Sequence, residues 1–313
     1  MIAESFYFKT KDNIEIFTHC WKPEINNKPI AVLQIAHGMA EYAERYKHFA
    51  EFLTEKGIII YANDHRGHGK TAKELKEHGF FALNNGWHKV VDDMKILSQI
   101  IKEKHPELPF FIFGHSMGSL LTRTYICNSI IIPKGIILSG TSGNPGIIRF
   151  VAKFIVFLFK NFKGKRARAK LLDKMTFGEF NKKIKKPKTP FDWLNTDEGE
   201  VNKYINDPLC GQLFTVQFFD DLLTGLGYIF NKKNIALIPK DLPLLMISGK
   251  EDPVGDFGKG VEKSYKLYKK AGLKNLTITL YPAMRHEIIN EKNKLTVYND
   301  IYNFLVFCLN NNR

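Results

Sequence analysis

Short apolar runs alternate with amphipathic helical patterns along much of this 313-residue chain, and that alternation limits its fold more than any other feature. The runs at 30–36 and 58–62 are almost continuously apolar, which is typical of strands buried on both faces of a parallel sheet. The helical patterns between such runs supply the right-handed crossovers that a parallel sheet needs. The alternation therefore predicts an α/β fold whose central sheet is mostly parallel and has about eight strands.

The expected elements follow from the spacing of apolar residues and from the turn residues between them. Strands are expected at 5–9 and 14–21 as an opening hairpin, then at 30–36, 58–62, 110–113, 135–139, 242–248 and 276–281; helices are expected at 41–56, 87–104, 120–128, 259–270 and in a last segment ending near 309. Between 141 and 240 the strand patterns stop. We interpret 1–140 and 241–313 as the core and 141–240 as an inserted, mainly helical cap (lid) domain.

Ser116 is the candidate nucleophile. It lies in the sequence Gly-His-Ser-Met-Gly at 114–118, directly after an apolar strand pattern and before a helical one. A serine in such a strand–turn–helix is held in a strained conformation with its hydroxyl exposed, and small neighbours avoid a collision at the turn. The five-residue pattern alone is weak evidence, but this context strengthens it.

A serine nucleophile needs a base within hydrogen-bond reach and a third group that orients the base. Of the ten histidines only His286 follows Ser116, in a loop after the strand expected at 276–281. Asp252 holds the equivalent position after the strand expected at 242–248, and Glu251 and Asp256 are neighbouring alternatives. In this type of sheet, loops at the carboxyl ends of the strands meet at one edge, so these side chains are expected to lie close together.

A developing oxyanion needs hydrogen-bond donors, and backbone amides commonly provide them. The amide after the nucleophile belongs to Met117, and Met39 lies in the loop after the strand expected at 30–36. We expect these two amides to form the oxyanion hole. His115, next to the nucleophile, is expected to be a neighbour of the base rather than the base itself.

Several ordered motifs together resemble one known family. They are His-Gly-Met-Ala-Glu at 37–41, Arg-Tyr at 45–46, Asp-His-Arg-Gly-His-Gly at 64–69, Gly-His-Ser-Met-Gly at 114–118, Asp252, and Arg-His-Glu at 285–287. The chain resembles the bacterial monoacylglycerol lipase and lysophospholipase branch of the α/β-hydrolase superfamily. Two segments of the expected cap, Phe-Asp-Trp-Leu at 191–194 and Asp-Pro-Leu-Cys-Gly at 207–211, also resemble bacterial members of that branch. Met39 departs from the small residue usual after His-Gly, which affects the expected width of the acyl entrance.

The resemblance implies hydrolysis of carboxylic esters of single-acyl-chain lipids through an acyl-enzyme, with no cofactor. It also implies that the loop containing Asp64, His65 and His68 is structural, whereas its three potential ligands on their own suggest a metal site. Two alternatives are a proline-type aminopeptidase of the same superfamily, for which the sequence shows no acidic pocket, and a non-catalytic lipid-binding module. The sequence leaves open the acyl length, the headgroup, acyl transfer as a competing reaction, and the oligomeric state.

The cap is expected to select the substrate. Residues 147–162 form a helical pattern with a wide apolar face, from which Phe150, Phe154, Phe157 and Leu158 are expected to contact substrate. On that helix Arg149, Lys153, Lys160 and Lys163 form one basic stripe, expected at lipid headgroups or along a solvated edge of a cap helix packed on the core.

The net charge of +14 is concentrated in this region, because residues 160–188 contain twelve basic and two acidic residues. We therefore expect peripheral contact between 147–188 and an anionic membrane surface. Nucleic-acid binding is disfavoured because no binding motif accompanies the basic residues. The first residues lack the apolar segment of a signal peptide and the four cysteines form no close pair, which favours a cytoplasmic protein. The basic segment adds the expectation of a peripheral position at the inner membrane face.

Overall fold

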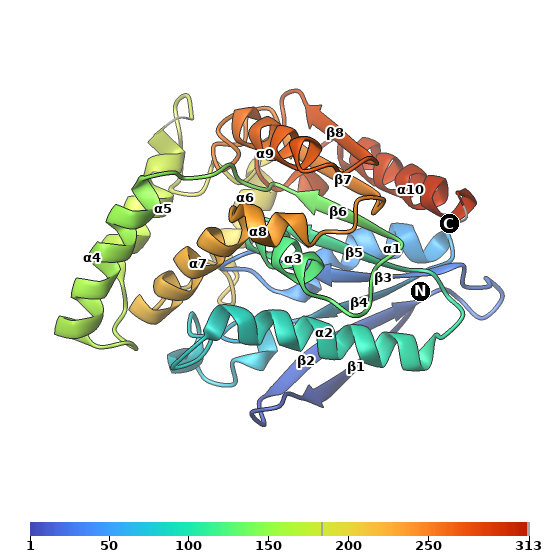
Figure 1. The fold of residues 1–313 in the computed structure, drawn as a ribbon, viewed down its shortest axis with the longest axis horizontal. Helices are drawn as coiled ribbons and strands as arrows, with labels where there is room; N and C mark the ends of the chain where they lie inside the picture. Colours follow the sequence, from blue (N-terminus) through green and yellow to red (C-terminus); the bar gives the residue numbers. More distant parts are fainter. Residues whose placement is uncertain (183, 312–313) are drawn as a thin grey trace.

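The computed structural model describes residues 1–182 and 184–311, and its centre is one eight-stranded sheet with the order β1-β2-β4-β3-β5-β6-β7-β8 (Figure 1). Strands β3 to β8 are parallel, whereas β1 pairs antiparallel with β2 and β2 pairs antiparallel with β4. The strands are β1 (Ile2–Lys9), β2 (Glu15–Lys22), β3 (Ala31–Ala36), β4 (Ile58–Asn63), β5 (Phe110–His115), β6 (Gly135–Ser139), β7 (Leu244–Gly249) and β8 (Leu276–Tyr281). The predicted α/β-hydrolase fold class is confirmed.

Helices cover both faces of the sheet, and each face has its own apolar core. The core helices are α1 (Lys47–Glu55), α2 (Gly86–Lys104), α3 (Met117–Cys127), α9 (Lys259–Lys270) and α10 (Lys294–Asn310). Side chains of one strand alternate between the two cores: Val32 of β3 packs with α2, α3 and α9, whereas Leu33 packs with α1 and α10. Burial on both faces explains why the central strands are almost continuously apolar.

Short 3₁₀ helices lie in the loops and are η1 (Ala43–Tyr46), η2 (Gly69–Thr71), η3 (Leu75–Glu77) and η4 (Ile288–Asn290). The helix expected at 41–56 is therefore split into η1 and α1. No helix in the described part of the chain is both long and apolar enough to cross a membrane.

Between β6 and β7 the chain forms α4 (Ile148–Lys163), α5 (Lys170–Lys182), α6 (Glu198–Asn206), α7 (Val216–Ile229) and α8 (Lys232–Ala236). Helices α4 and α5 extend from one end of the molecule (Figure 1). Helix α7 instead packs on α2 and α3, and its Phe218 and Phe219 belong to the core beside the sheet. The segment proposed as the cap, 141–240, thus includes a helix that is part of the core packing.

Candidate active site

Ser116 lies at the sharp turn between β5 and α3. Its backbone has φ 51° and ψ −118°, a strained conformation for a residue with a side chain. The two glycines of the motif are required by close packing. A Cβ atom at Gly118 would lie 2.0 Å from the carbonyl oxygen of Ala36, and one at Gly114 would lie 2.5 Å from that of Gly118. The turn can therefore form only with glycine at both positions.

His286 and Asp252 follow β8 and β7, and the fold brings them together. The Nδ1 atom of His286 lies 2.9 Å from Oδ2 of Asp252, and both side chains are buried. Asp252 also accepts hydrogen bonds from the backbone N–H of Val254 at 2.9 Å and from the hydroxyl of Ser248 at 3.2 Å. These bonds hold the carboxylate against Nδ1, which leaves Nε2 of the imidazole for proton transfer.

The alternative acids Glu251 and Asp256 are exposed at the surface. Burial by itself lowers the pKa of His286, but the charge of Asp252 and their hydrogen bond outweigh burial and raise this pKa above its usual value. Among the acids that the sequence left open, Asp252 is therefore the one whose contacts suit the orienting role.

Ser116 and His286 line one cavity of about 70 Å³, together with Met39 of the loop after β3. Met117 is the first residue of α3, and the first N–H groups of a helix have no partner within the helix. Its side chain is buried, which the proposed role tolerates because that role uses only the backbone amide. The positions of Met39 and Met117 are thus compatible with an oxyanion hole beside Ser116.

His115 contacts the base without competing for its role. Its Nδ1 atom lies 3.2 Å from the hydroxyl of Ser139, and its ring centre lies 4.7 Å from that of His286. Burial holds the pKa of His115 well below its usual value, and the nearby His286 lowers it further. His115 therefore packs as a neutral ring beside the base.

A buried ionic network joins the loop after β3 to the loop that carries His286. Arg45 donates two hydrogen bonds to Glu287, at 2.5 and 2.7 Å, and one to Glu41 at 3.0 Å. Glu41 also accepts hydrogen bonds from the backbone N–H of Gly38 at 2.5 Å and from the hydroxyl of Tyr46 at 2.8 Å. In the sequence these residues stood out only as members of the family motifs. The opposite charges of Arg45 and the two glutamates could have suggested that they pair.

The loop that suggested a metal site is held by internal hydrogen bonds. Its Asp64 carboxylate accepts hydrogen bonds from the backbone N–H groups of Ala43 at 2.8 Å and Lys70 at 2.7 Å, while burial raises its pKa to about 6. Burial lowers the pKa of His65 to about 3 and that of His68 to about 4, so both rings are neutral. Within the described ranges, no group of three potential ligand side chains is placed to hold a metal ion.

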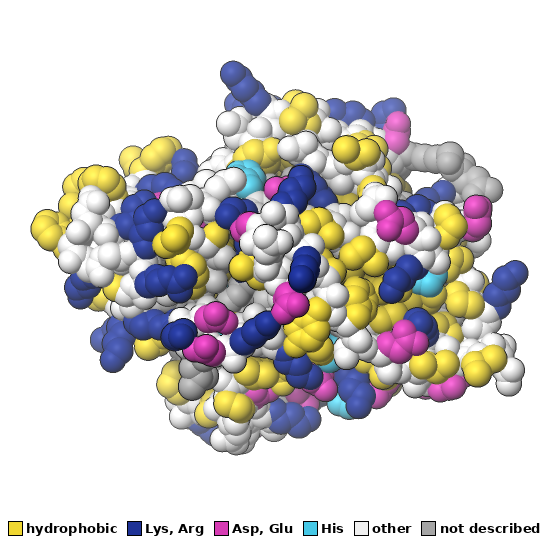
Figure 2. All heavy atoms as spheres, turned by 90° about the horizontal axis from the view of Figure 1, so that it is seen from below, with side chains coloured by type: hydrophobic (Ala, Val, Ile, Leu, Met, Phe, Trp, Pro, Cys, Tyr) yellow, Lys and Arg dark blue, Asp and Glu magenta, His cyan; other side chains and the backbone are white. Residues whose placement is uncertain are grey.

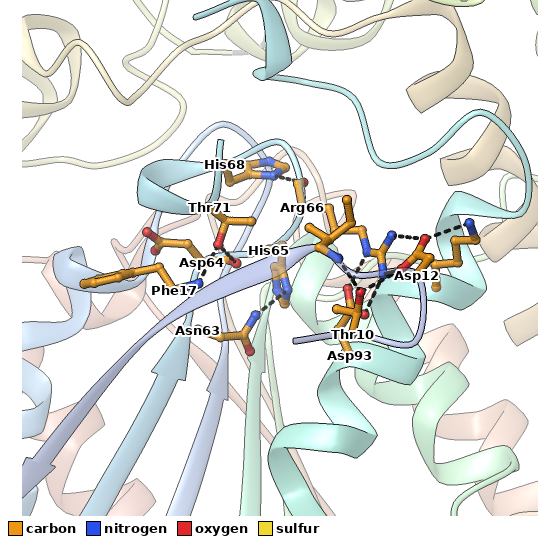
Figure 3. A network of polar contacts seen from close by, with 12 residues as sticks. Thr10, Asp12, Phe17, Asn63, Asp64, His65, Arg66, His68, Thr71 and Asp93 are labelled. Atoms are coloured by element: carbon orange, nitrogen blue, oxygen red, sulfur yellow. Dashed lines mark hydrogen bonds and ion pairs between the residues drawn. The ribbon is translucent and has the colours of Figure 1, made fainter. Parts of the chain in front are cut away.

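Next to these histidines, Arg66 forms a separate network that ties the loop to its surroundings (Figure 3). Its guanidinium group donates to Asp93 of α2 at 2.6 and 2.9 Å and to Asp12 at 2.6 and 2.8 Å. Asp12 lies in the turn between β1 and β2, so Arg66 joins that hairpin to a core helix. In this structure the loop thus has an architectural role.

The four cap residues expected to contact substrate do not line the catalytic cavity. Phe150, Phe154 and Phe157 are 62%, 61% and 53% exposed, and Leu158 is 37% exposed. Helical spacing defines an apolar face but does not say which neighbour that face meets, so contact between these four residues and substrate stays a prediction.

Two of the four residues of the basic stripe on α4 face α7, whereas Lys163 is exposed. Lys153 and Lys160 both pair with Asp220 of α7, each at 2.8 Å, so these two residues do not occupy the expected place at lipid headgroups.

Other cap residues line the cavity. They are Asp173 of α5, Phe191, Trp193 and Leu194, Tyr204 of α6, and Gly211 and Gln212. The ring of Trp193 lies 5.3 Å from that of His286. Motif resemblance had singled out the segments 191–194 and 207–211 without assigning them a role, whereas nothing in the sequence distinguished Asp173.

The loop carrying the base is also bonded to the cap. The backbone N–H of Glu287 donates to the carbonyl oxygen of Leu194 at 2.8 Å, and Arg285 donates to those of Asp192 and Asn195 at 2.6 and 2.9 Å. The cap segment around Trp193 is therefore fixed to the catalytic loop.

Comparison with known proteins shows which family this chain belongs to. A family model described as serine aminopeptidase, S33, matches residues 27–293. The chain belongs to this family. Among curated relatives, a monoacylglycerol lipase of Mycolicibacterium smegmatis is 28% identical over 296 residues, covering 94% of this chain and 93% of the relative. A monoglyceride lipase of Mus musculus is 25% identical, covering 91% of this chain and 84% of the relative.

Solved structures show the same relationship. A carboxyl esterase from Bacillus coagulans, solved in complex with glycerol, has a TM-score of 0.91 at 27% identity and covers 99% of both chains. A monoglyceride lipase from Saccharomyces cerevisiae has a TM-score of 0.78 at 21% identity. The match covers 98% of this chain and 96% of the yeast chain, and it shows that the two share a fold. The resemblance inferred from the motifs is confirmed: the protein is a monoglyceride lipase-like serine hydrolase that acts on carboxylic esters.

Proposed function

We propose that the protein hydrolyses esters of single-acyl-chain lipids, with monoacylglycerols as the main substrate class. The observation that carries the proposal is a serine at a strained turn that shares one small cavity with a buried histidine bonded to an aspartate. The curated relatives that match almost the whole chain support the substrate class, since they are named as monoacylglycerol or monoglyceride lipases.

In the proposed mechanism the Ser116 hydroxyl attacks the ester carbonyl while Nε2 of His286 takes its proton. The carbonyl oxygen becomes an oxyanion that accepts hydrogen bonds from the amides of Met39 and Met117. His286 then donates the proton to the leaving alcohol, which leaves an acyl-enzyme on Ser116. Water, activated by the same imidazole, attacks the acyl carbon and releases the fatty acid. Asp252 stabilises the imidazolium that forms in both steps.

A labelling experiment tests the nucleophile. A fluorophosphonate probe should label the wild type at Ser116, and Ser116→Ala should lose both the label and activity on p-nitrophenyl esters by several orders of magnitude. Circular dichroism should show the same fold for both proteins. Activity above a few per cent of wild type in a folded Ser116→Ala variant contradicts the assignment.

A substrate panel tests the function. Monoacylglycerols, lysophospholipids and aminoacyl amides should be compared under the same conditions. Faster cleavage of aminoacyl amides than of every acyl ester would favour the aminopeptidase alternative.

We also propose that the cap contacts anionic membranes, through α4 and nearby lysines. Large apolar side chains lie exposed on α4, and those of Phe150, Phe154 and Phe157 are more than half exposed. Figure 2 shows apolar and basic side chains side by side at this end of the molecule. A helix with an exposed apolar face next to basic residues suits a membrane interface.

The basic residues available beside the exposed apolar face of α4 differ in part from the stripe expected on that helix. Lys153 and Lys160 pair with Asp220, and Arg168 donates to the backbone carbonyls of Leu213 at 2.7 Å and Lys76 at 3.1 Å. Other basic residues of this region are exposed: Lys163 at the end of α4, Arg166 after it, and Lys170, Lys174, Lys185 and Lys186 on and after α5. Lys183, also in the basic segment, lies outside the described residues.

Vesicle binding tests the membrane contact. Wild type should bind vesicles containing anionic lipid more tightly than neutral ones, and Phe154→Ser should weaken binding to both. Phe307→Ser is a matched control, because Phe307 is 58% exposed but lies on α10. Binding that anionic lipid does not change, or an equal loss in both variants, contradicts the proposal.

A further inference from the structure

Asp173 places a carboxylate from the cap in the catalytic cavity. It lies on α5, is half-buried, and lines the same cavity as Ser116 and His286. Desolvation raises its pKa to about 6, so at neutral pH the carboxylate is mostly ionised. The mechanism proposed above gives it no role.

The ionic surroundings of Asp173 differ from those of the other acids at the cavity. Glu41 and Glu287 both bind Arg45, whereas the Asp173 carboxylate has no hydrogen bond or ion pair with any residue that the structure describes. Partial burial of a charge without a partner costs free energy, and such groups are concentrated at functional sites.

The size of the cavity suggests which part of a substrate meets Asp173. At about 70 Å³ it is about half the size of an engineered cavity of about 150 Å³ that binds benzene, so it suits a small polar group and is too small for a long acyl chain. His286 lines this cavity and, in the proposed mechanism, protonates the leaving alcohol. The alcohol part of the ester therefore lies on this side of Ser116.

We propose that Asp173 selects substrates by the charge of their alcohol part: it accepts hydrogen bonds from the hydroxyls of a neutral polyol headgroup and disfavours headgroups that carry a phosphate. The inference rests on the proposed function. Among the single-acyl-chain lipids that this function covers, it predicts a preference for monoacylglycerols over anionic lysophospholipids. A carboxylate suits this role because its oxygens only accept hydrogen bonds, and hydroxyls donate them. A phosphodiester offers a like charge to the same oxygens. Two such charges about 5 Å apart in a partly desolvated site lower binding at least about tenfold.

The test compares two lipids with the same oleoyl chain, monooleoylglycerol and lysophosphatidylglycerol, in wild type and Asp173→Asn. The variant should raise the ratio of kcat/KM for the anionic lipid to kcat/KM for the neutral lipid by about tenfold or more. Any general effect of the variant on catalysis changes kcat/KM for both lipids alike and cancels in this ratio. Activity on p-nitrophenyl butyrate, whose alcohol part has neither a polyol nor a phosphate, measures that general effect separately.

Glu179→Gln is the matched control. Glu179 lies on the same helix and pairs with Lys182, but it is exposed and is not among the residues lining the cavity. This control removes the same charge without entering the cavity, so its ratio should stay at the wild-type value.

An unchanged ratio in Asp173→Asn overturns the inference. An equal change in Glu179→Gln also overturns it, because the effect would then come from attraction of the anionic substrate to the protein surface. Failure of the proposed function gives a different result: wild type would cleave p-nitrophenyl butyrate but neither lipid.

Discussion

Replacing Arg45 with methionine tests whether the buried ionic network stabilises the two catalytic loops. Arg45 has an 11% exposed side chain, and the carboxylates of Glu41 and Glu287 on either side are each 5% exposed. Removing the arginine leaves two carboxylates facing each other in a dry site. Breaking a buried pair in this way costs about 3–5 kcal/mol, because the remaining charge has no partner.

The expected change in melting temperature follows from that cost. At about 2 °C per kcal/mol for a large domain, the Tm of Arg45→Met should fall by roughly 6–10 °C. Lys188→Met is the control, since it breaks an exposed pair with Glu198 that contributes at most about 1 kcal/mol. Scans at one fixed heating rate should compare the variants with wild type.

The pH dependence gives a second measurement with a definite sign. Burial raises the pKa of Glu287, but the charge and hydrogen bonds of Arg45 outweigh it, so this pKa lies below its usual value. In wild type Glu287 therefore contributes stability above its unfolded pKa, and that stability is lost as pH falls through the folded pKa. Without Arg45 burial dominates and the folded pKa rises above the unfolded one. In the variant, the stability that protonated Glu287 contributes is lost as pH rises from its unfolded pKa to its higher folded pKa.

The difference in Tm between wild type and Arg45→Met should consequently shrink as the pH is lowered from 7 toward 5. Arg45→Met combined with Glu287→Gln should recover part of the loss at pH 7, because one uncompensated charge is gone. A Tm within 1 °C of wild type, or a difference that grows toward low pH, would falsify this account of the network.

Two further predictions concern the catalytic residues. Asp252→Asn should lower kcat on p-nitrophenyl butyrate by about 10⁴-fold, since the imidazole loses its orienting carboxylate. The pKa of His286 should fall because burial remains while the raising charge is gone, so the residual activity should persist to lower pH; an acid limb that moves upward contradicts this. Gly118→Ala should prevent the close approach to Ala36 and yield little folded protein, as measured by thermal unfolding, whereas a fully active variant would show that the turn adapts.

Much of the catalytic edge could be predicted from sequence because its geometry follows from the order of the elements. Parallel strands place their following loops at one edge, so Ser116, Asp252 and His286 could be proposed from the glycine motif, the order along the chain and their positions after strands. The central sheet and its opening hairpin were predicted from the spacing of apolar residues and from turn residues, and the structure confirms that fold. The turn at Ser116 requires glycine at position 118, and this requirement appears in the sequence as the Gly-His-Ser-Met-Gly pattern.

Cap contacts depend on which way each helix faces, and periodicity does not encode that direction. The spacing in α4 correctly separated an apolar face from a basic one, but only the fold placed Asp220 opposite Lys153 and Lys160 and left the phenylalanines exposed. Asp173 is one ordinary acidic residue among many until tertiary packing brings it into the cavity with Ser116. The sequence by itself thus determined the sheet and the order of the candidate catalytic residues, because local patterns and chain order specify both. Tertiary structure alone decided what the cap presents to substrate and to solvent, because that depends on contacts between segments far apart in the chain.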